Sequence, residues 1–361
     1  MDIDMYYDLA VRDFEEDPQI MVRKEKEYKT RTDPMNTLSD FEFKRQFRFS
    51  KDSVQRLTQL LTGSLEKANN RGLPVKPEDQ ILITLSHLGG AHFQRTSGWS
   101  YGVCQRTAAS CVERVVNSLL EIKGEFVMMP NAEEMSKTSE RMYERFKLPG
   151  FALAVDGMHV RFVEAPRGIP DHIPKQTFWC RKQYFSINVQ LVCDDRLIRD
   201  VDCSWPGSTH DSRIWRLSEA KRYLEQQRRF KVAGDTGYPI SEILIKPYST
   251  QEVGDDRRKR LFNKRLSGAR TVMSECIFGV LKRRWPILTA MRNHFVLAQK
   301  ITVATAILFN IGRLWGDLWE EEDILDDVQE EGVLVQDGDE ASMRRRGQIE
   351  RDRLMDAMPF P

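Results

Sequence analysis

Two short apolar segments, each ending in an aspartate beside a glycine, most restrict what this chain can fold into. "FALAVDG" covers residues 151–157 and "FKVAGDTG" covers residues 230–237. Apolar runs of this length bounded by turn residues are typical of buried strands, and glycine lets the backbone turn sharply at the strand end. We therefore expect Asp156 and Asp235 to project from the edge of a sheet into a cleft. Taken singly, each aspartate has the alternative of an ordinary turn or cap.

Further strands and helices follow one another around these two segments. "FSINVQLVCD" and "LIRDVDCSW" alternate as strands do, and "STHDSRIWRLSEAKRYLEQQ" predicts a helix capped by Ser208 or Thr209. "RTVMSECIFGVLKRRWPIL" and "KITVATAILFNIGRLWGDLW" predict an amphipathic helix and a closing apolar helix. Strands that come first and then alternate with helices predict an α/β or α+β class.

The chain before these strands has a helical pattern. Its predicted parts are a polar arm at 1–39, a helical domain at 40–148, an α/β domain at 149–317, and an acidic tail with a short terminal helix at 318–361. Within the helical domain, a short amphipathic piece, a turn near Gly102 and a long helix follow in the order of a helix-turn-helix. Gln105, Arg106 and Thr107 begin the second helix, where such a helix meets base edges. A plain helical bundle is the alternative.

Composition excludes few functions. The chain has 361 residues and a net charge of +1, so no global field indicates an acidic or basic partner. Its six cysteines show no Cys-x-x-Cys pair, which favours free thiols in a reducing compartment. We expect no association with a membrane, because we find no apolar stretch of about 18 residues and the acidic N-terminus is unlike a signal peptide. A nuclear or cytoplasmic location follows.

Four acids stand out by their positions: Asp156, Asp211, Asp235 and Glu275. Asp211 lies just inside a predicted helix, and Glu275 lies on the amphipathic one. Carboxylates that gather repel one another unless a divalent cation neutralises them, and an oxygen-only set suits Mg²⁺ or Mn²⁺. Such ions can activate water against a phosphodiester.

Basic and imidazole side chains lie near these acids in the sequence. Lys282 follows Glu275 by two helical turns, and Arg283 comes next, which fits contact with a phosphate backbone or an ordinary solvated face. The basic run at 257–265 fits DNA contact, a nuclear signal or a solvated loop. His159 and His210 flank two of the acids and fit either a supporting role at the metal or a structural hydrogen bond.

The ordered segments "AVDGMHVRF", "SWPGSTHDSRIW", "VAGDTGYP" and "FNKRLSGARTVMSECIFGVLKRRWPIL" carry a resemblance. Over about 149–317 the chain resembles the PIF/Harbinger transposase family and its domesticated HARBI-type nucleases of animals. The resemblance implies an RNase H-like DDE domain in which Asp156, Asp235 and Glu275 are catalytic. It also implies that Asp211 is a fourth metal ligand, and that the protein works with a Myb-like DNA-binding partner.

Two positions depart from related patterns. Arg270 precedes Glu275 by five residues, where related insertion-sequence transposases have a spacing of four. Cys104 stands where similar proteins often have a serine before the recognition helix, which weakens the expected cap.

These observations predict a divalent-metal-dependent DNA endonuclease of transposase origin. The alternative is a catalytically silent DNA-binding or adaptor protein that keeps the fold. A metal-dependent phosphatase acting on small molecules is a third possibility. A homo-oligomer is left open.

Overall fold

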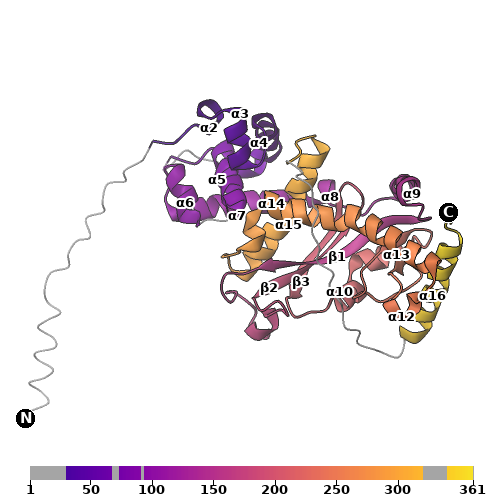
Figure 1. Ribbon diagram of the computed structural model, residues 1–361. Helices are drawn as coiled ribbons and strands as arrows, with labels where there is room; N and C mark the ends of the chain where they lie inside the picture. Colours follow the sequence, from indigo (N-terminus) through magenta and orange to yellow (C-terminus); the bar gives the residue numbers. More distant parts are fainter. Residues whose placement is uncertain (1–29, 67–72, 91–92, 320–339, 361) are drawn as a thin grey trace, which may run out of the picture.

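The structure is a computed structural model that describes residues 30–66, 73–90, 93–319 and 340–360 (Figure 1). Most of the predicted polar arm and the acidic stretch 320–339 lie outside the described residues. The expectations for those two segments therefore stay predictions.

A five-stranded mixed sheet forms the centre of the C-terminal half, in the order β3-β2-β1-β4-β5. The strands are β1 Phe151–Arg161, β2 Ser186–Cys193, β3 Ile198–Pro206, β4 Lys231–Ala233 and β5 Leu244–Ile245. β2 is antiparallel to both β1 and β3, whereas β4 is parallel to both β1 and β5. The four predicted strands are confirmed. β5 was not predicted, because two residues are too few for a periodic pattern.

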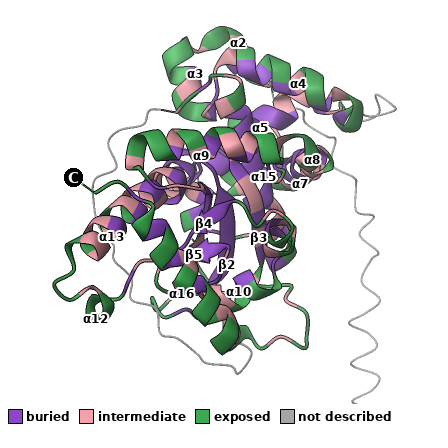
Figure 2. Cartoon of the chain, turned by 90° about the vertical axis from the view of Figure 1, so that its right-hand side faces the viewer, coloured by how far each residue is buried: buried purple, intermediate pink, exposed green. Residues whose placement is uncertain are grey.

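Helices cover both faces of this sheet, which lies buried between them in Figure 2. Because successive side chains of a strand point to opposite faces, β1 contributes to both layers. Ala154 and Met158 pack in the clusters that include α13 Arg257–Arg270, the π-helical turn η2 Thr271–Glu275, α14 Cys276–Arg284 and α15 Phe295–Leu314. Leu153 and Val155 pack with α10 Asp211–Leu217 and α11 Glu219–Glu225.

The remaining short elements connect these layers. They are η1 Lys175–Phe178, α12 Thr250–Val253 and η3 Pro286–Thr289. The basic run 257–265, for which a loop was one reading, lies inside α13 and leads directly into the segment that carries Glu275.

The N-terminal half is helical, as predicted. Its helices are α2 Pro34–Thr37, α3 Asp40–Phe47, α4 Lys51–Leu65, α5 Pro77–Gly90, α6 Gln94–Ser100, α7 Gln105–Glu121, α8 Lys123–Phe126 and α9 Ala132–Phe146. Ser50 caps α4 by accepting a hydrogen bond from the backbone of Ser53, and Pro77 opens α5 at a position that needs no N–H donor. Gly102 has a φ of 63° in the turn between α6 and α7. Cys104 makes no side-chain cap for α7, as its replacement of serine predicts.

A buried arginine joins the helical N-terminal half to the sheet-containing C-terminal half. Arg284, at the end of α14, is 1% exposed and its guanidinium lies 4.3 Å from the centre of the Phe49 ring. It donates a 2.7 Å hydrogen bond to the carbonyl of Arg48, and Gly312 of α15 leaves the room that the guanidinium occupies. The two halves share one continuous hydrophobic cluster around this point.

The apolar helix α15 corrects one expectation. It is 20 residues long and apolar enough to pass as a membrane span, although the sequence was expected to hold no such stretch. Most of α15 is buried against the sheet and the N-terminal helices, which accounts for its apolar composition without a membrane.

The last helix, α16 Glu340–Asp356, packs onto the sheet-containing half beside α12 and α13 (Figure 1). Leu354, Met355 and Met358 are buried in the same cluster as Phe262 of α13. The C-terminal helix therefore belongs to the hydrophobic core of the sheet-containing half.

Candidate carboxylate site

Asp156 and Asp235 lie at the same level on neighbouring parallel strands. β1 and β4 pair Ala154 with Ala233, and each aspartate follows its paired alanine by two residues. β4 ends at Ala233, whereas β1 continues beyond Asp156 along antiparallel β2. Asp235 thus follows the end of its strand, as predicted. The expectation that Asp156 also ends its strand is wrong, because pairing with β2 extends β1 to Arg161.

The environment of Asp156 is negative and largely closed. Its side chain is 14% exposed, Arg270 forms a 3.3 Å ion pair with Oδ2, and Ser274 donates to the same oxygen over 3.4 Å. The backbone N–H of Gly157 donates to Oδ1 over 2.8 Å. Burial raises the pKa of Asp156 to about 7; Arg270 opposes this rise, and the charges of Asp235 and Asp211 add to it. Arg270 therefore does not fully offset the effects of burial and of the neighbouring carboxylates on the pKa of Asp156.

Asp235 is held by its own turn. The backbone N–H of Gly237 donates to Asp235 Oδ1 over 2.9 Å, which fixes the carboxylate immediately after β4. A Cβ on Gly234 would lie 2.8 Å from Leu244 of β5, so Gly234 is needed for close packing of the strands and not to leave room for a ligand.

Asp211 reaches the site from the other face of the sheet. Gly157 points away from the face that holds Asp156, because neighbouring residues of a strand alternate. A Cβ on Gly157 would lie 2.5 Å from Asp211 Oδ1, so the carboxylate of Asp211 occupies the space that any larger side chain would fill. Asn188 of β2 donates to Asp211 Oδ1 and to the carbonyl of Thr209, both over 2.8 Å. The cap of α10 is His210, without a side-chain cap bond, and not Ser208 or Thr209 as expected.

A buried tyrosine lies near the three aspartates. Tyr238 is fully buried and meets Trp215 in an edge arrangement, with the two ring planes 82° apart. Burial and the charges of Asp211, Asp156 and Asp235 raise the pKa of its hydroxyl well above the ordinary value, which keeps it neutral. Its position near the aspartates depends on packing between distant segments, which no local pattern encodes.

Glu275 ends the π-helical turn η2, and its side chain lies outside what the structure describes. The backbone N–H of Cys276 bonds to the carbonyl of Thr271, five residues back. A π turn absorbs one more residue than an α turn, which accounts for the spacing of five between Arg270 and Glu275. Arg270 and Ser274 of this segment both contact Asp156, so the backbone that carries Glu275 packs directly against β1.

The donor set fits a hard divalent cation. The charges of Asp235 and Asp211 both raise the pKa of Asp156, which places the three carboxylates near one another. Oxygen ligands suit Mg²⁺ or Mn²⁺. Among the described side chains, no three Asp, Glu, His or Cys residues already stand as a metal-holding group. That search leaves out the side chain of Glu275. Arg270 is the cation that now faces Asp156.

The other residues singled out from the sequence lie apart from this cluster or support it. His159 shares a 3.0 Å hydrogen bond with Ser186, which fits the structural reading of that histidine. Gln105, Arg106 and Thr107 begin α7, where the first two are exposed. Lys282 and Arg283 lie in the last turn of α14, close in sequence to the buried Arg284.

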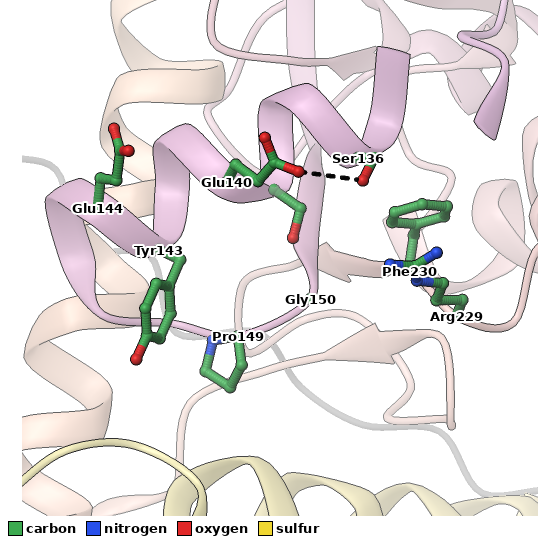
Figure 3. A pocket seen from close by; sticks show the side chains of 9 residues that line it. Ser136, Glu140, Tyr143, Glu144, Pro149, Gly150, Arg229 and Phe230 are labelled. Carbon is green, nitrogen blue, oxygen red and sulfur yellow. Dashed lines mark hydrogen bonds between the residues drawn. The ribbon is translucent and has the colours of Figure 1, made fainter. Parts of the chain in front are cut away.

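A separate pocket opens at the opposite end of the strands. It has a volume of about 550 Å³ and lies between the end of α9 and the segments that precede β1 and β4 (Figure 3). Glu140, Glu144 and Tyr143 of α9 line it together with Arg229. Because β1 and β4 start here and the aspartates lie farther along them, this pocket is distinct from the carboxylate site.

The comparisons with known proteins agree with this site. Residues 155–310, which contain all four predicted acids, match the family described as "DDE superfamily endonuclease". This region, which is built on a mixed sheet with flanking helices, is thus similar to a DDE endonuclease domain.

Individual relatives extend the similarity beyond that domain. The chain is 27% identical over 291 residues to the cattle (Bos taurus) protein "Putative nuclease HARBI1", covering 78% of this chain and 79% of that protein. The human (Homo sapiens) HARBI1 is 26% identical over the same shares. "Protein ALP1-like" of Arabidopsis thaliana is 25% identical, covering 68% of this chain and 62% of that protein. The predicted resemblance to Harbinger-derived nucleases is confirmed by these matches. No solved structure matches the chain.

Proposed function

We propose that this protein is a divalent-metal-dependent DNA endonuclease of RNase H-like fold. The observation that carries the proposal is the equal level of Asp156 and Asp235 on adjacent parallel strands, beside the segment that ends in Glu275. The strand order, with three antiparallel strands followed by two parallel ones, supports the RNase H-like assignment. The names of the relatives support nuclease activity.

The residues have distinct roles in this proposal. Asp156, Asp235 and Glu275 hold Mg²⁺ or Mn²⁺, with Asp211 as the fourth ligand. The bound metal would supply an activated water and stabilise the leaving oxygen of the phosphodiester. Gly157 and Gly237 fix two carboxylates by backbone N–H donation, and Asn188 orients Asp211. Arg270 neutralises Asp156 until metal binds.

Substrate and cellular context belong to the same proposal. Gln105, Arg106 and Thr107 on α7 contact DNA if the α6–α7 pair works as a helix-turn-helix, and Lys282 and Arg283 contact its backbone. A Myb-like protein is the expected DNA-binding partner, and the nucleus is the expected location. Both rest on the resemblance to Harbinger-derived proteins.

A nicking assay tests the activity. Purified protein is incubated with supercoiled plasmid in Mg²⁺ or Mn²⁺, and the appearance of open circles is followed. We expect Asp235→Asn to reduce nicking by at least about 10²-fold, since loss of one charged stabilising group commonly costs that much. Asp171→Asn, an exposed aspartate in the loop after β1, is the matched control and keeps full activity. Equal nicking by wild type and Asp235→Asn would show that the activity comes from a contaminant or another site.

A further inference from the structure

The C-terminal helix α16 is locked along the outer edge of the sheet. Buried Lys231, the first residue of β4, forms a 2.9 Å ion pair with Glu350 of α16. Arg351 is 4% exposed at its side chain and pairs with Glu252 at 2.5 Å. A Cβ on Gly347 would lie 2.7 Å from the backbone of Ser241, so α16 approaches the chain before β5 very closely. These contacts fix the position of the helix against the sheet.

Two exposed arginines near the start of α16 form no ion pair with a carboxylate among the described residues. The helix carries Arg344, Arg345 and Arg346 in its first turns, and all three are exposed. Arg346 lies 3.7 Å from Glu242, and Arg351 is occupied by Glu252 and by the Tyr248 ring at 3.7 Å. Within the part of the chain that the structure describes, no carboxylate forms an ion pair with Arg344 or Arg345.

A lysine connects these arginines to the carboxylate site. Lys246 directly follows β5, whose Ile245 pairs with Ala233 of β4, so it lies one strand outward from Asp235. Its ammonium donates a 3.1 Å hydrogen bond to the carbonyl of Thr236, the residue after Asp235. Burial lowers the pKa of Lys246, and the charges of Arg344 and Arg351 lower it further, whereas Asp235 and Glu252 raise it. Lys246 therefore lies within reach of the charges of both Arg344 and Asp235.

We propose that Lys246, Arg344 and Arg345 form a phosphate-binding surface that holds the backbone of duplex DNA next to the carboxylate site. This surface is called the edge surface below, and its role as a DNA contact rests on the proposed nuclease function. A duplex presents a row of phosphates at close spacing, and fixed cations beside the site can engage those that flank the cleaved bond. Because α16 lies outside residues 155–310, the matched endonuclease domain does not include two of these three residues.

Binding can be measured without cleavage. The full chain carrying Asp235→Asn is titrated, in EDTA, into a fluorescein-labelled mixed-sequence duplex of about 30 base pairs at roughly 50 to 200 mM KCl. We expect Arg344→Gln with Arg345→Gln to weaken binding about 5- to 30-fold at the lowest salt. The slope of log affinity against log salt should become shallower by about two, because each phosphate contact contributes about 0.9. Lys246→Gln alone should reduce the slope by about one.

Matched controls separate the effect of this surface from a general loss of positive charge or of folding. Arg222→Gln removes one positive charge, as Lys246→Gln does, but from α11 on the other face of the sheet. It should leave both DNA affinity and salt slope unchanged. Thermal melting of each variant confirms folding, since Arg344 and Arg345 are exposed. An unchanged DNA affinity and salt slope in the double variant would overturn the proposal. The proposal would also be overturned if the double variant bound DNA normally but lost binding to an acidic peptide. Failure of plasmid nicking by the wild type would instead count against the proposed nuclease function, so the two failures can be told apart.

Discussion

The carboxylate of Asp211 occupies the space that a side chain at Gly157 would need: Asp211 Oδ1 lies 2.5 Å from the point where a Cβ on Gly157 would stand. A strand residue between two catalytic candidates is therefore kept as glycine by the approach of an acid from the opposite face of the sheet. The hydrogen bond from Asn188 to the same oxygen fixes that approach.

Gly157→Ala should displace Asp211 and destabilise the protein by about 1–3 kcal/mol, because the added methyl group overlaps a hydrogen-bonded carboxylate. Nicking should fall together with stability if Asp211 binds metal. Chemical denaturation and the plasmid assay measure the two effects. Gly63→Ala is the control, since nothing lies within 4 Å of its Cβ position in α4, and there alanine should stabilise the helix by up to about 1 kcal/mol. Wild-type stability in Gly157→Ala would show that Asp211 moves freely.

Asp156→Asn should make the metal-free protein more stable at neutral pH. The folded-state pKa of Asp156 is raised to about 7 from 3.8, so the folded protein keeps a proton that the unfolded chain releases at lower pH. This stabilisation is full below about pH 4 and is lost as the pH rises through about 7. We expect the stability advantage of Asp156→Asn over wild type to grow across that window and reach about 1–3 kcal/mol at pH 8.

Melting temperatures in EDTA between about pH 4 and pH 8 give the measurement for Asp156. Asp171→Asn, which removes an exposed carboxylate, should run parallel to wild type. A difference between Asp156→Asn and wild type that is constant over the whole range would contradict the proton linkage.

Divalent metal should stabilise the folded protein through the acids. At a concentration about 100-fold above its dissociation constant, Mn²⁺ should add about 2.7 kcal/mol to the free energy of unfolding. Asp156→Asn and Asp235→Asn should each lose most of this gain, because a ligand oxygen loses its charge. Thermal melts with and without Mn²⁺ test this without any need for turnover, and a gain retained in both variants would place the metal elsewhere.

Arg284→Ala should destabilise the protein by about 2–4 kcal/mol, because a buried side chain that packs on Phe49 and bonds to the backbone of Arg48 is removed. Arg284→Met keeps much of the volume and should cost less, since apolar replacement of a buried charge is often tolerated. Urea unfolding measures both. The neighbouring exposed Arg283→Ala should change stability by less than about 0.5 kcal/mol. Equal effects at positions 283 and 284 would mean that the buried arginine does not join the two halves.

The sequence determined four of the five strands and a few helix starts. The apolar runs that become β1 to β4, the cap at Ser50 and the first residues of α5 and α7 all follow from local pattern. It also placed Asp235 just after a strand, because the glycines beside it favour a turn there. It placed Asp156 at a strand end as well, whereas β1 continues to Arg161 along β2.

Tertiary structure alone decided how the acids meet. The equal level of Asp156 and Asp235 depends on the pairing of Ala154 with Ala233, residues 79 positions apart, which no local period encodes. The approach of Asp211 under Gly157, the contact of Arg270 with Asp156 and the π turn before Cys276 are likewise products of packing between distant segments. The charges on α16 carried no positional meaning in the sequence. They gained one because Glu350 and Arg351 fix that helix against the strand edge beside Lys246.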